Sequence, residues 1–340
     1  MFSRKTLTAI AVSIGLLCAT SPYANSTEPV PVVASFSILG DMVQRIGGAH
    51  VSVTTLVGPD GDTHVYQPTP ADARAVSKAQ LLFVNGLDFE GWIDRLVKAS
   101  GFQGNRAVVT QGIKPIAYED NHDEHHKDEV GKDEHGHKNE HADTDRHKGH
   151  TDDKHGGDHA GHDHGAFDPH AWQSLKNAVI YVDNITAALA KTIPTEWRTF
   201  YRNRAAYVAE IEALDSEIQK SVAELPIGHR TVVTSHDAFQ YFARDYGLKF
   251  LAPQGFSTES EASAKDVATL IKQMREQTIS AVFVENITDP RLIKQIADET
   301  GAAIGGTLYP GALSGPDGPA ATYLDMMRHN ATTLAKSLKP

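Results

Sequence analysis

Short apolar runs rich in β-branched residues alternate with amphipathic helical patterns along most of the chain. Runs such as PVVASF, VSVTTLV and LLFVNG are interspersed with helical patterns such as ILGDMVQRIGG and PADARAVSKA. The alternation resumes after residue 228, where RTVVTS, KFLAP, SAVFVEN and AAIGGTL are the apolar runs. Alternating strands and helices are typical of parallel sheets flanked by helices. The pattern therefore predicts an α/β fold with two such regions.

Two stretches 200 residues apart share this pattern closely. VVASFSILGDMVQRIG at 32–47 and VVTSHDAFQYFARDYG at 232–247 have Val-Val, Ser and a terminal Gly at matching positions. A strand, a turn, a helix and a glycine at the helix end then fall in register. We expect two similar lobes with parallel sheets flanked by helices.

The region between the lobes is expected to form one long helix. Residues 194–226 begin with Pro-Thr and end with Pro226, and the residues between these two prolines include neither glycine nor proline. A helix from about 195 to 223 would be about 43 Å long at ~1.5 Å per residue. Because domain linkers are usually flexible, a rigid helix here predicts restricted hinge motion. We expect the N-terminal lobe at 25–193, the linker helix at 194–226 and the C-terminal lobe at 227–340.

The first 24 residues have the features of a secretory signal peptide. Arg4 and Lys5 precede an apolar stretch from Leu7 to Ala19, and Ala24 offers a small residue for cleavage. This stretch is short for a membrane span, and no later segment approaches ~20 apolar residues. We therefore expect a soluble mature chain exported to the periplasm.

The single cysteine, Cys18, lies inside this leader. A lipid anchor at Cys18 is the alternative to cleavage near Ala24, but Leu17 is bulky where such a site usually has a small residue. After cleavage the mature chain has no thiol, so it would be exported without disulfides. Any bound metal must then be held by His, Asp, Glu or water.

Most of the negative charge belongs to one low-complexity segment. The whole chain carries a formal net charge of −11, and residues 119–165 combine 15 Asp/Glu and 6 Lys/Arg with 12 of the 18 histidines. This segment has no apolar period, so we expect it to be disordered without metal. The chain has no basic patch that would indicate nucleic-acid binding.

Three of the other six histidines lie in turns at predicted element ends. His64 follows the run VSVTTLV, His170 precedes a helix expected to begin near Ser174, and His236 follows the run that opens the second lobe. Parallel sheets bind ligands beyond the carboxyl ends of their strands, so these histidines should meet in the cleft. A lone histidine in such a turn is usually structural, but three in similar settings favour a shared metal site. Three neutral imidazoles with water in the fourth position form a common zinc shell.

The remaining histidines, interpreted as surface residues, are His50, His229 and His329.

Several motifs resemble the cluster A-I solute-binding proteins of zinc and manganese ABC importers, most closely the zinc (ZnuA-type) branch. They are GDTHVYQPTP, DPHAWQSLKNA, TSHDAFQYFARDYGL, ESEASAKDVATLIKQM and TYLDMMRHN, and the resemblance covers essentially the whole mature chain. It implies two α/β lobes joined by one long helix, with a metal site in the cleft. Transferred by motif, the metal ligands are His64, His170 and His236. The zinc branch has histidine at the third position and often an acidic His-rich loop before the second ligand.

The chain departs from the family at the fourth ligand. Many members carry an aspartate after the last strand, and the matching position here is Gly311. Water is our first choice for this ligand, and the alternatives are Asp317, Glu285 or a histidine of the His-rich segment. The lack of cysteine in the mature chain also differs from zinc members that have a disulfide in the second lobe.

The resemblance implies high-affinity zinc capture by a periplasmic monomer that delivers the ion to an ABC transporter permease. Manganese or another divalent metal is the alternative within the same importer class. A His₃-zinc enzyme is less favoured, because the chain lacks HExxH and GxSxG motifs. Glu259 and Glu261 are candidates to lie near the cleft, but the simpler interpretation is that they are charges at a helix start. A metal buffer acting through the His-rich segment alone would leave the two ordered lobes unexplained.

Overall fold

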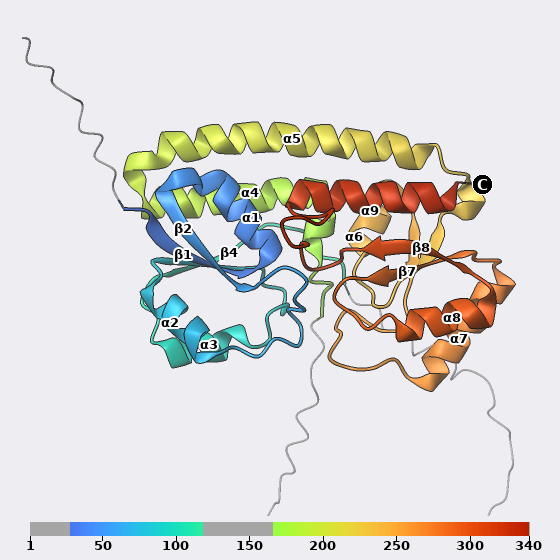
Figure 1. The fold of residues 1–340 in the computed structure, drawn as a ribbon. Helices are drawn as coiled ribbons and strands as arrows, with labels where there is room; N and C mark the ends of the chain where they lie inside the picture. Colours follow the sequence, from blue (N-terminus) through green and yellow to red (C-terminus); the bar gives the residue numbers. More distant parts are fainter. Residues whose placement is uncertain (1–27, 118–165, 340) are drawn as a thin grey trace, which may run out of the picture.

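The computed structural model describes residues 28–117 and 166–339 and contains two four-stranded parallel sheets (Figure 1). The predicted signal peptide and the His-rich segment at 119–165 lie outside the described residues. We call the two halves, each built on one sheet, the N-terminal and C-terminal lobes. The strands of the first sheet are β1 (Val30–Phe36), β2 (Val51–Val57), β3 (Leu81–Val84) and β4 (Asn105–Val108). Those of the second are β5 (Thr231–Val233), β6 (Lys249–Leu251), β7 (Ala281–Glu285) and β8 (Ala303–Leu308).

The two sheets have the same topology, in the orders β2-β1-β3-β4 and β6-β5-β7-β8. The predicted α/β fold with two similar lobes is therefore confirmed. The helices beside the first sheet are α1 (Ser37–Gly47), α2 (Pro70–Lys78), α3 (Ile93–Ser100) and α4 (Leu175–Thr192). Those beside the second are α6 (Gln240–Tyr246), α7 (Ala264–Glu276), α8 (Arg291–Thr300) and α9 (Tyr323–Leu338).

The glycines at the ends of the repeated stretches differ by one position. Gly247 ends α6 in the left-handed conformation with φ 71°, as the pattern predicts. In α1, Gly47 is the last helical residue, and the following Gly48 has the positive φ of 57°. Both helices thus end at a glycine that tolerates a backbone conformation costly for other residues.

A single 27-residue helix, α5 (Trp197–Ala223), runs along both lobes (Figure 1). It follows a short 3₁₀ turn at Pro194–Glu196 and agrees with the helix predicted from about 195 to 223. Its length is about 40 Å at ~1.5 Å per residue. It packs against α4 and α1 of the N-terminal lobe and against α9 and α6 of the C-terminal lobe.

The buried face of α5 belongs to a hydrophobic core shared by both lobes. Its fully buried side chains follow helical spacing and are Phe200, Tyr207, Ile211, Leu214, Ile218 and Val222. They join one continuous cluster that also contains Phe83 of β3 in the first sheet and Phe283 of β7 in the second. Burying such a side chain contributes about 1.5–3 kcal/mol. A large rotation of one lobe would therefore uncover part of this core, which supports limited hinge motion.

Among the described residues, no helix combines the length and the apolar character that a bilayer span needs.

Candidate metal centre

The three histidines predicted as ligands meet between the two lobes. His64 lies in the loop after β2, His170 directly precedes the 3₁₀ turn Ala171–Gln173, and His236 follows β5. One nitrogen from each ring lies within 4.8 Å of the other two. The exposed fraction is 8% for His64 and 0% for the other two. The structure therefore brings together side chains that are as much as 172 positions apart in the sequence.

The distance between two of these nitrogens suits a shared ion. The Nε2 atoms of His64 and His170 lie 3.3 Å apart. Two nitrogens bound tetrahedrally to one zinc ion at ~2.0–2.1 Å would be separated by about 3.3 Å. The Nε2 atom of His236 is buried and has no hydrogen-bond partner in the described part of the chain. A buried polar atom without a partner is costly, and a metal ion would satisfy it.

Each histidine backbone is held by a carboxylate. The amide of His64 donates to Oδ1 of Asp62, and the amide of His170 donates to Oδ1 of Asp168, both at 2.9 Å. The amide of His236 donates to Oε1 of Glu285 at 3.2 Å, although Glu285 lies 49 positions away. The first two carboxylates act through a local turn, because each aspartate stands two residues before its histidine. All three imidazoles thus project from backbones fixed by a charge-assisted hydrogen bond.

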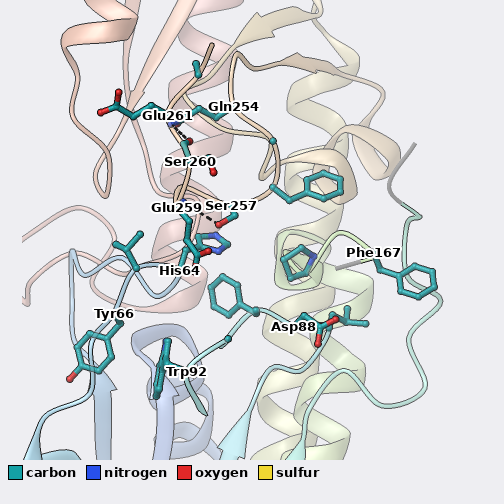
Figure 2. A pocket seen from close by; sticks show the side chains of 18 of the residues that line it. His64, Tyr66, Asp88, Trp92, Phe167, Gln254, Ser257, Glu259, Ser260 and Glu261 are labelled. Carbon is teal, nitrogen blue, oxygen red and sulfur yellow. Dashed lines mark hydrogen bonds between the residues drawn. The ribbon is translucent and has the colours of Figure 1, made fainter. Parts of the chain in front are cut away.

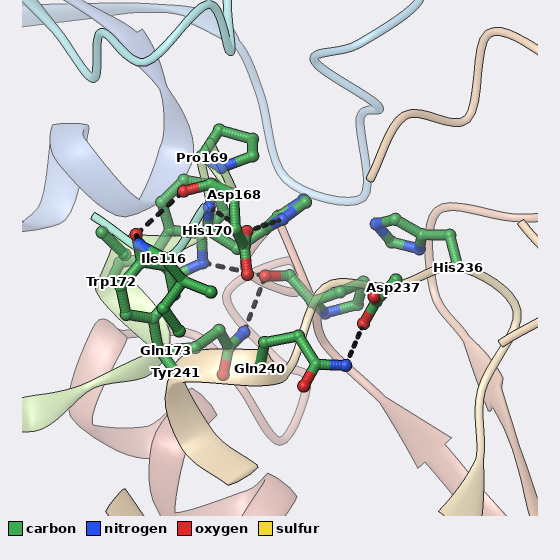
Figure 3. A network of polar contacts seen from close by, with 12 residues as sticks. Ile116, Asp168, Pro169, His170, Trp172, Gln173, His236, Asp237, Gln240 and Tyr241 are labelled. Carbon is green, nitrogen blue, oxygen red and sulfur yellow. Dashed lines mark hydrogen bonds and ion pairs between the residues drawn. The ribbon is translucent and has the colours of Figure 1, made fainter. Parts of the chain in front are cut away.

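Two of the same carboxylates also contact the imidazole rings, and Figure 3 shows the pair formed by Asp168 and His170. Nδ1 of His170 lies 2.8 Å from Oδ1 of Asp168, and Nδ1 of His236 lies 2.6 Å from Oε2 of Glu285. A carboxylate at Nδ1 favours the ring form that carries hydrogen there, which leaves the lone pair on Nε2. Such carboxylate–histidine pairs orient metal-binding rings and raise their basicity.

The electrostatic environment keeps two of the rings neutral. Burial lowers the pKa of His64 well below 6.5, and the neighbouring His170 and His236 lower it further. Burial and His236 likewise lower the pKa of His170 well below its usual value. Burial opposes the charge on His236 too and is the largest single effect, but the ion pair and hydrogen bond with Glu285, together with the charges of Asp62 and Asp237, raise the pKa overall. Burial also raises the pKa of Asp168 to about 7.

Aromatic rings form one wall of the centre. The Phe89 ring lies 4.9 Å from the His64 ring and 5.9 Å from the His170 ring, between ring centroids. The Trp172 ring lies 5.3 Å from the His170 ring, and its Nε1 donates to the carbonyl of Pro310. This apolar wall excludes water from one side of the histidines and strengthens electrostatic interactions there.

A groove between the lobes leads to His64 (Figure 2). Its volume is about 900 Å³, and its lining includes Tyr66, Trp92 and Phe167 from the N-terminal lobe. Glu259 and Glu261 line the opposite side. They lie in the loop before α7, whose first turn is capped by Ser263. These glutamates therefore line the groove, as the alternative to a purely helix-start role predicted.

Neither Glu285 nor Asp317, the two proposed fourth ligands within the described residues, lies free beside the three imidazoles, and the histidines of the His-rich segment lie outside those residues. Glu285 already binds two backbone amides and the His236 ring. Asp317 is exposed, and the described cluster of metal-binding side chains consists of histidines alone. Gly311 is buried, and a Cβ atom there would lie 3.7 Å from Ile287 Cδ1 and 3.9 Å from Trp172 Cζ2, which is ordinary contact.

Sequence reasoning did not single out Asp62 and Asp168. The signal was present, because Asp62-Thr63-His64 and Asp168-Pro169-His170 share the spacing Asp-x-His. Glu285 was considered only as a fourth metal ligand, whereas in the structure its Oε2 contacts Nδ1 of His236.

Two histidines interpreted as surface residues are in fact half-buried. His50 lies 3.5 Å from a carboxylate oxygen of Glu196, and its ring packs edge-on against Phe200. His329 lies in α9, with its Nε2 3.0 Å from the carbonyl oxygen of Thr307. The interpretation was wrong for both, because each side chain has a structural contact. His229 is exposed, as expected.

Comparison with known proteins finds a consistent family. The model of the family described as ZnuA, zinc-uptake complex component A, periplasmic, matches residues 32–337. The iron-binding protein YfeA of Yersinia pestis is 31% identical over 96% of this chain and 91% of its own. The manganese-binding lipoprotein MntA of Bacillus subtilis is 31% identical over 95% of this chain and 94% of its own. The structure of the periplasmic zinc-binding protein TroA from Treponema pallidum superposes with a TM-score of 0.76 at 25% identity, covering 92% of this chain and all of that one.

Proposed function

Since the chain belongs to the ZnuA family of substrate-binding components of metal ABC transporters, we propose that its own substrate is zinc. The observation that carries the proposal is the convergence of His64, His170 and His236, a cluster that holds no carboxylate from the described part of the chain. Imidazole nitrogen suits zinc, whereas manganese and other hard ions favour oxygen ligands. Relatives named for iron and manganese make manganese or another divalent metal the alternative substrate.

In this proposal the protein binds the ion in the periplasm and delivers it to an ABC permease. His64 and His170 are ready to bind because they are neutral, and His236 binds after its Nε2 proton leaves. Water completes the coordination shell. The shared core along α5 keeps the lobes close together, so capture depends on movements of the loops around the groove.

The setting proposed for this function follows from the sequence. The leader at 1–24 would direct export to the periplasm, where the mature chain would act as a monomer beside an ABC permease. A binding role is favoured over a hydrolytic one because Asp168 and Glu285 are engaged with the imidazoles instead of being available as general bases.

Replacement of the histidines tests the proposal. Each of His64→Ala, His170→Ala and His236→Ala should weaken zinc binding at least a hundredfold in a protein that lacks residues 120–164. His229→Ala is the matched control, because His229 is exposed. Competition titrations with zinc and manganese at matched free concentrations measure both affinity and preference. Equal competition by manganese would contradict zinc as the substrate, and unchanged affinity in all three variants would contradict the assigned site.

A further inference from the structure

Three hydrogen bonds tie the loop that carries His64 to the C-terminal lobe. We call residues 58–69 the His64 loop. Thr258 Oγ1 donates to Asp62 Oδ2 at 2.6 Å, and Asn286 Nδ2 donates to Asp60 Oδ1 at 2.9 Å. The amide of Asp60 donates to the carbonyl of Leu313 at 2.8 Å. The two lobes are therefore joined beside the metal centre by the protein itself.

Asp62 has a particular place among these contacts. Its Oδ1 accepts the amide of His64 at 2.9 Å, while its Oδ2 accepts the hydroxyl of Thr258 from across the groove. Asp62 and Thr258 are both half-buried, and hydrogen bonds to a carboxylate are stronger than those between neutral groups. One carboxylate thus fixes the backbone of His64 relative to the opposite lobe.

The loop that carries Thr258 is in turn joined to His236. Gln254 forms an isolated parallel bridge with His236, and the amide of Asp237 donates to the carbonyl of Gly255 at 3.0 Å. Thr258 follows within the same loop between β6 and α7. A continuous path of backbone and hydrogen bonds therefore connects His236 to His64 through Thr258.

We propose that Asp62 and Thr258 form a latch that positions His64 against His236 and slows the release of the bound ion. This inference rests on the proposed function, because it assumes that the three histidines hold the transported metal. An ion held by His64 and His236 would connect the same two loops as the latch. Release requires at least one imidazole to withdraw, and the latch restrains the loop that would withdraw.

The latch should act mainly on the dissociation rate. Contacts that hold a binding site together usually change how long a ligand stays, while association rates vary less. Loss of a preorganised loop also lowers affinity, because the loop must then be ordered when the ion binds. A partly shielded hydrogen bond to a carboxylate is sufficient for about a tenfold change in rate.

Substitutions at Thr258 test the latch in the full-length protein. Thr258→Val removes the hydroxyl at nearly constant volume, and Thr258→Ser keeps it. Thr269→Val is the control, because the hydroxyl of Thr269 donates to the carbonyl of Lys265 within α7 of the same lobe. Each protein is loaded with one equivalent of zinc and mixed rapidly with excess chromophoric chelator, and thermal unfolding of each variant is compared.

We expect dissociation about ten times faster in Thr258→Val than in the wild type, and near-wild-type rates in Thr258→Ser and Thr269→Val. Equal rates in Thr258→Val and the wild type would overturn the latch. A rate in Thr258→Ser as fast as that in Thr258→Val would also overturn it, because the hydroxyl would then be irrelevant. Failure of the wild type to load zinc would instead overturn the proposed function, so the two failures are distinguished at the loading step.

Discussion

Oε2 of Glu285 lies 2.6 Å from Nδ1 of His236, while Oε1 of the same carboxylate accepts the backbone amides of Ser235 and His236. Glu285 ends β7, so a strand of the C-terminal sheet fixes both the backbone and the ring of one proposed ligand. Glu285→Gln should therefore weaken zinc binding 10- to 100-fold, the range typical for a residue that supports a metal ligand. Equilibrium competition with a chelator measures the change.

Glu259→Gln provides the matched control for this substitution. Glu259 is exposed and lines the groove. Among the described residues, no hydrogen bond or ion pair joins it to the three histidine rings. It should change zinc affinity less than threefold. If the two glutamine variants behave alike, the loss reflects the negative charge of the groove instead of the orientation of His236.

Zinc affinity should decrease as the pH is lowered, and the decrease should begin at a pH above the usual pKa of histidine. The pKa of His236 is raised, because Glu285, Asp62 and Asp237 together outweigh the opposing effect of burial. Zinc must displace the proton on Nε2, so the apparent affinity falls about tenfold per pH unit below that pKa. His64 and His170 do not contribute to the pH dependence of zinc affinity near pH 6.5, because their pKa values lie well below 6.5.

Calorimetry in two buffers of different ionisation enthalpy counts the released protons. We expect about one proton per zinc ion at a pH one unit or more below the raised pKa, and fewer as the pH rises through it. In Glu285→Gln burial acts on His236 without the opposing ion pair, so the fall in affinity should move to lower pH. A pH dependence that begins only well below 6.5 in the wild type would contradict the raised pKa.

The sequence predicts the local elements of this protein and the meeting of its three histidines, but not the distant side chains that hold those histidines. The helix expected at about 195–223 is α5, because neither glycine nor proline interrupts the segment. His170 before the capped start of α4 could also be located from turn residues nearby. The partnership of Glu285 with His236 could not, because it spans 49 positions and depends on how β5 and β7 pair.

Gly311 offers a direct test of the fourth ligand. The resemblance described above implies an aspartate at the matching position in many relatives, and a Cβ atom at Gly311 would make only ordinary contacts with Ile287 and Trp172. Gly311→Asp should add an oxygen ligand and raise the affinity for manganese relative to zinc at least tenfold, since hard oxygen ligands suit manganese. Competition titrations with both ions give the ratio.

Gly311→Ala separates ligation from packing. It adds the same Cβ atom without an oxygen, so its manganese-to-zinc ratio should equal that of the wild type. A shift of equal size in the alanine and aspartate variants would mean that the added volume changes the site. No shift in either variant would mean that this position does not reach the metal.

The residues that flank the His-rich segment are bonded to one another, so the segment can be removed without displacing its two ends. Ala117 and Phe167 form an antiparallel bridge, and the amide of Asp168 donates to the carbonyl of Ile116 at 2.9 Å. The hydroxyl of Tyr241 donates to the carbonyl of Asp168 and accepts the amide of Ile116 (Figure 3). A short glycine linker in place of residues 120–164 should therefore leave His170 in position.

We expect this deletion to remove several weaker zinc equivalents and to leave one tight equivalent. The histidines at 122–164 have irregular spacings and many glycines between them, so each site they form must order the chain and binds more weakly than a preorganised one. Tethered beside the cleft, they would still raise the local zinc concentration, so deletion should slow uptake mainly when zinc is scarce. Equilibrium dialysis counts the equivalents, and growth under zinc limitation measures the effect. Loss of the tight equivalent would mean that one of these histidines supplies the fourth ligand that Gly311 lacks, and no loss in either measurement would identify the segment as an acidic linker.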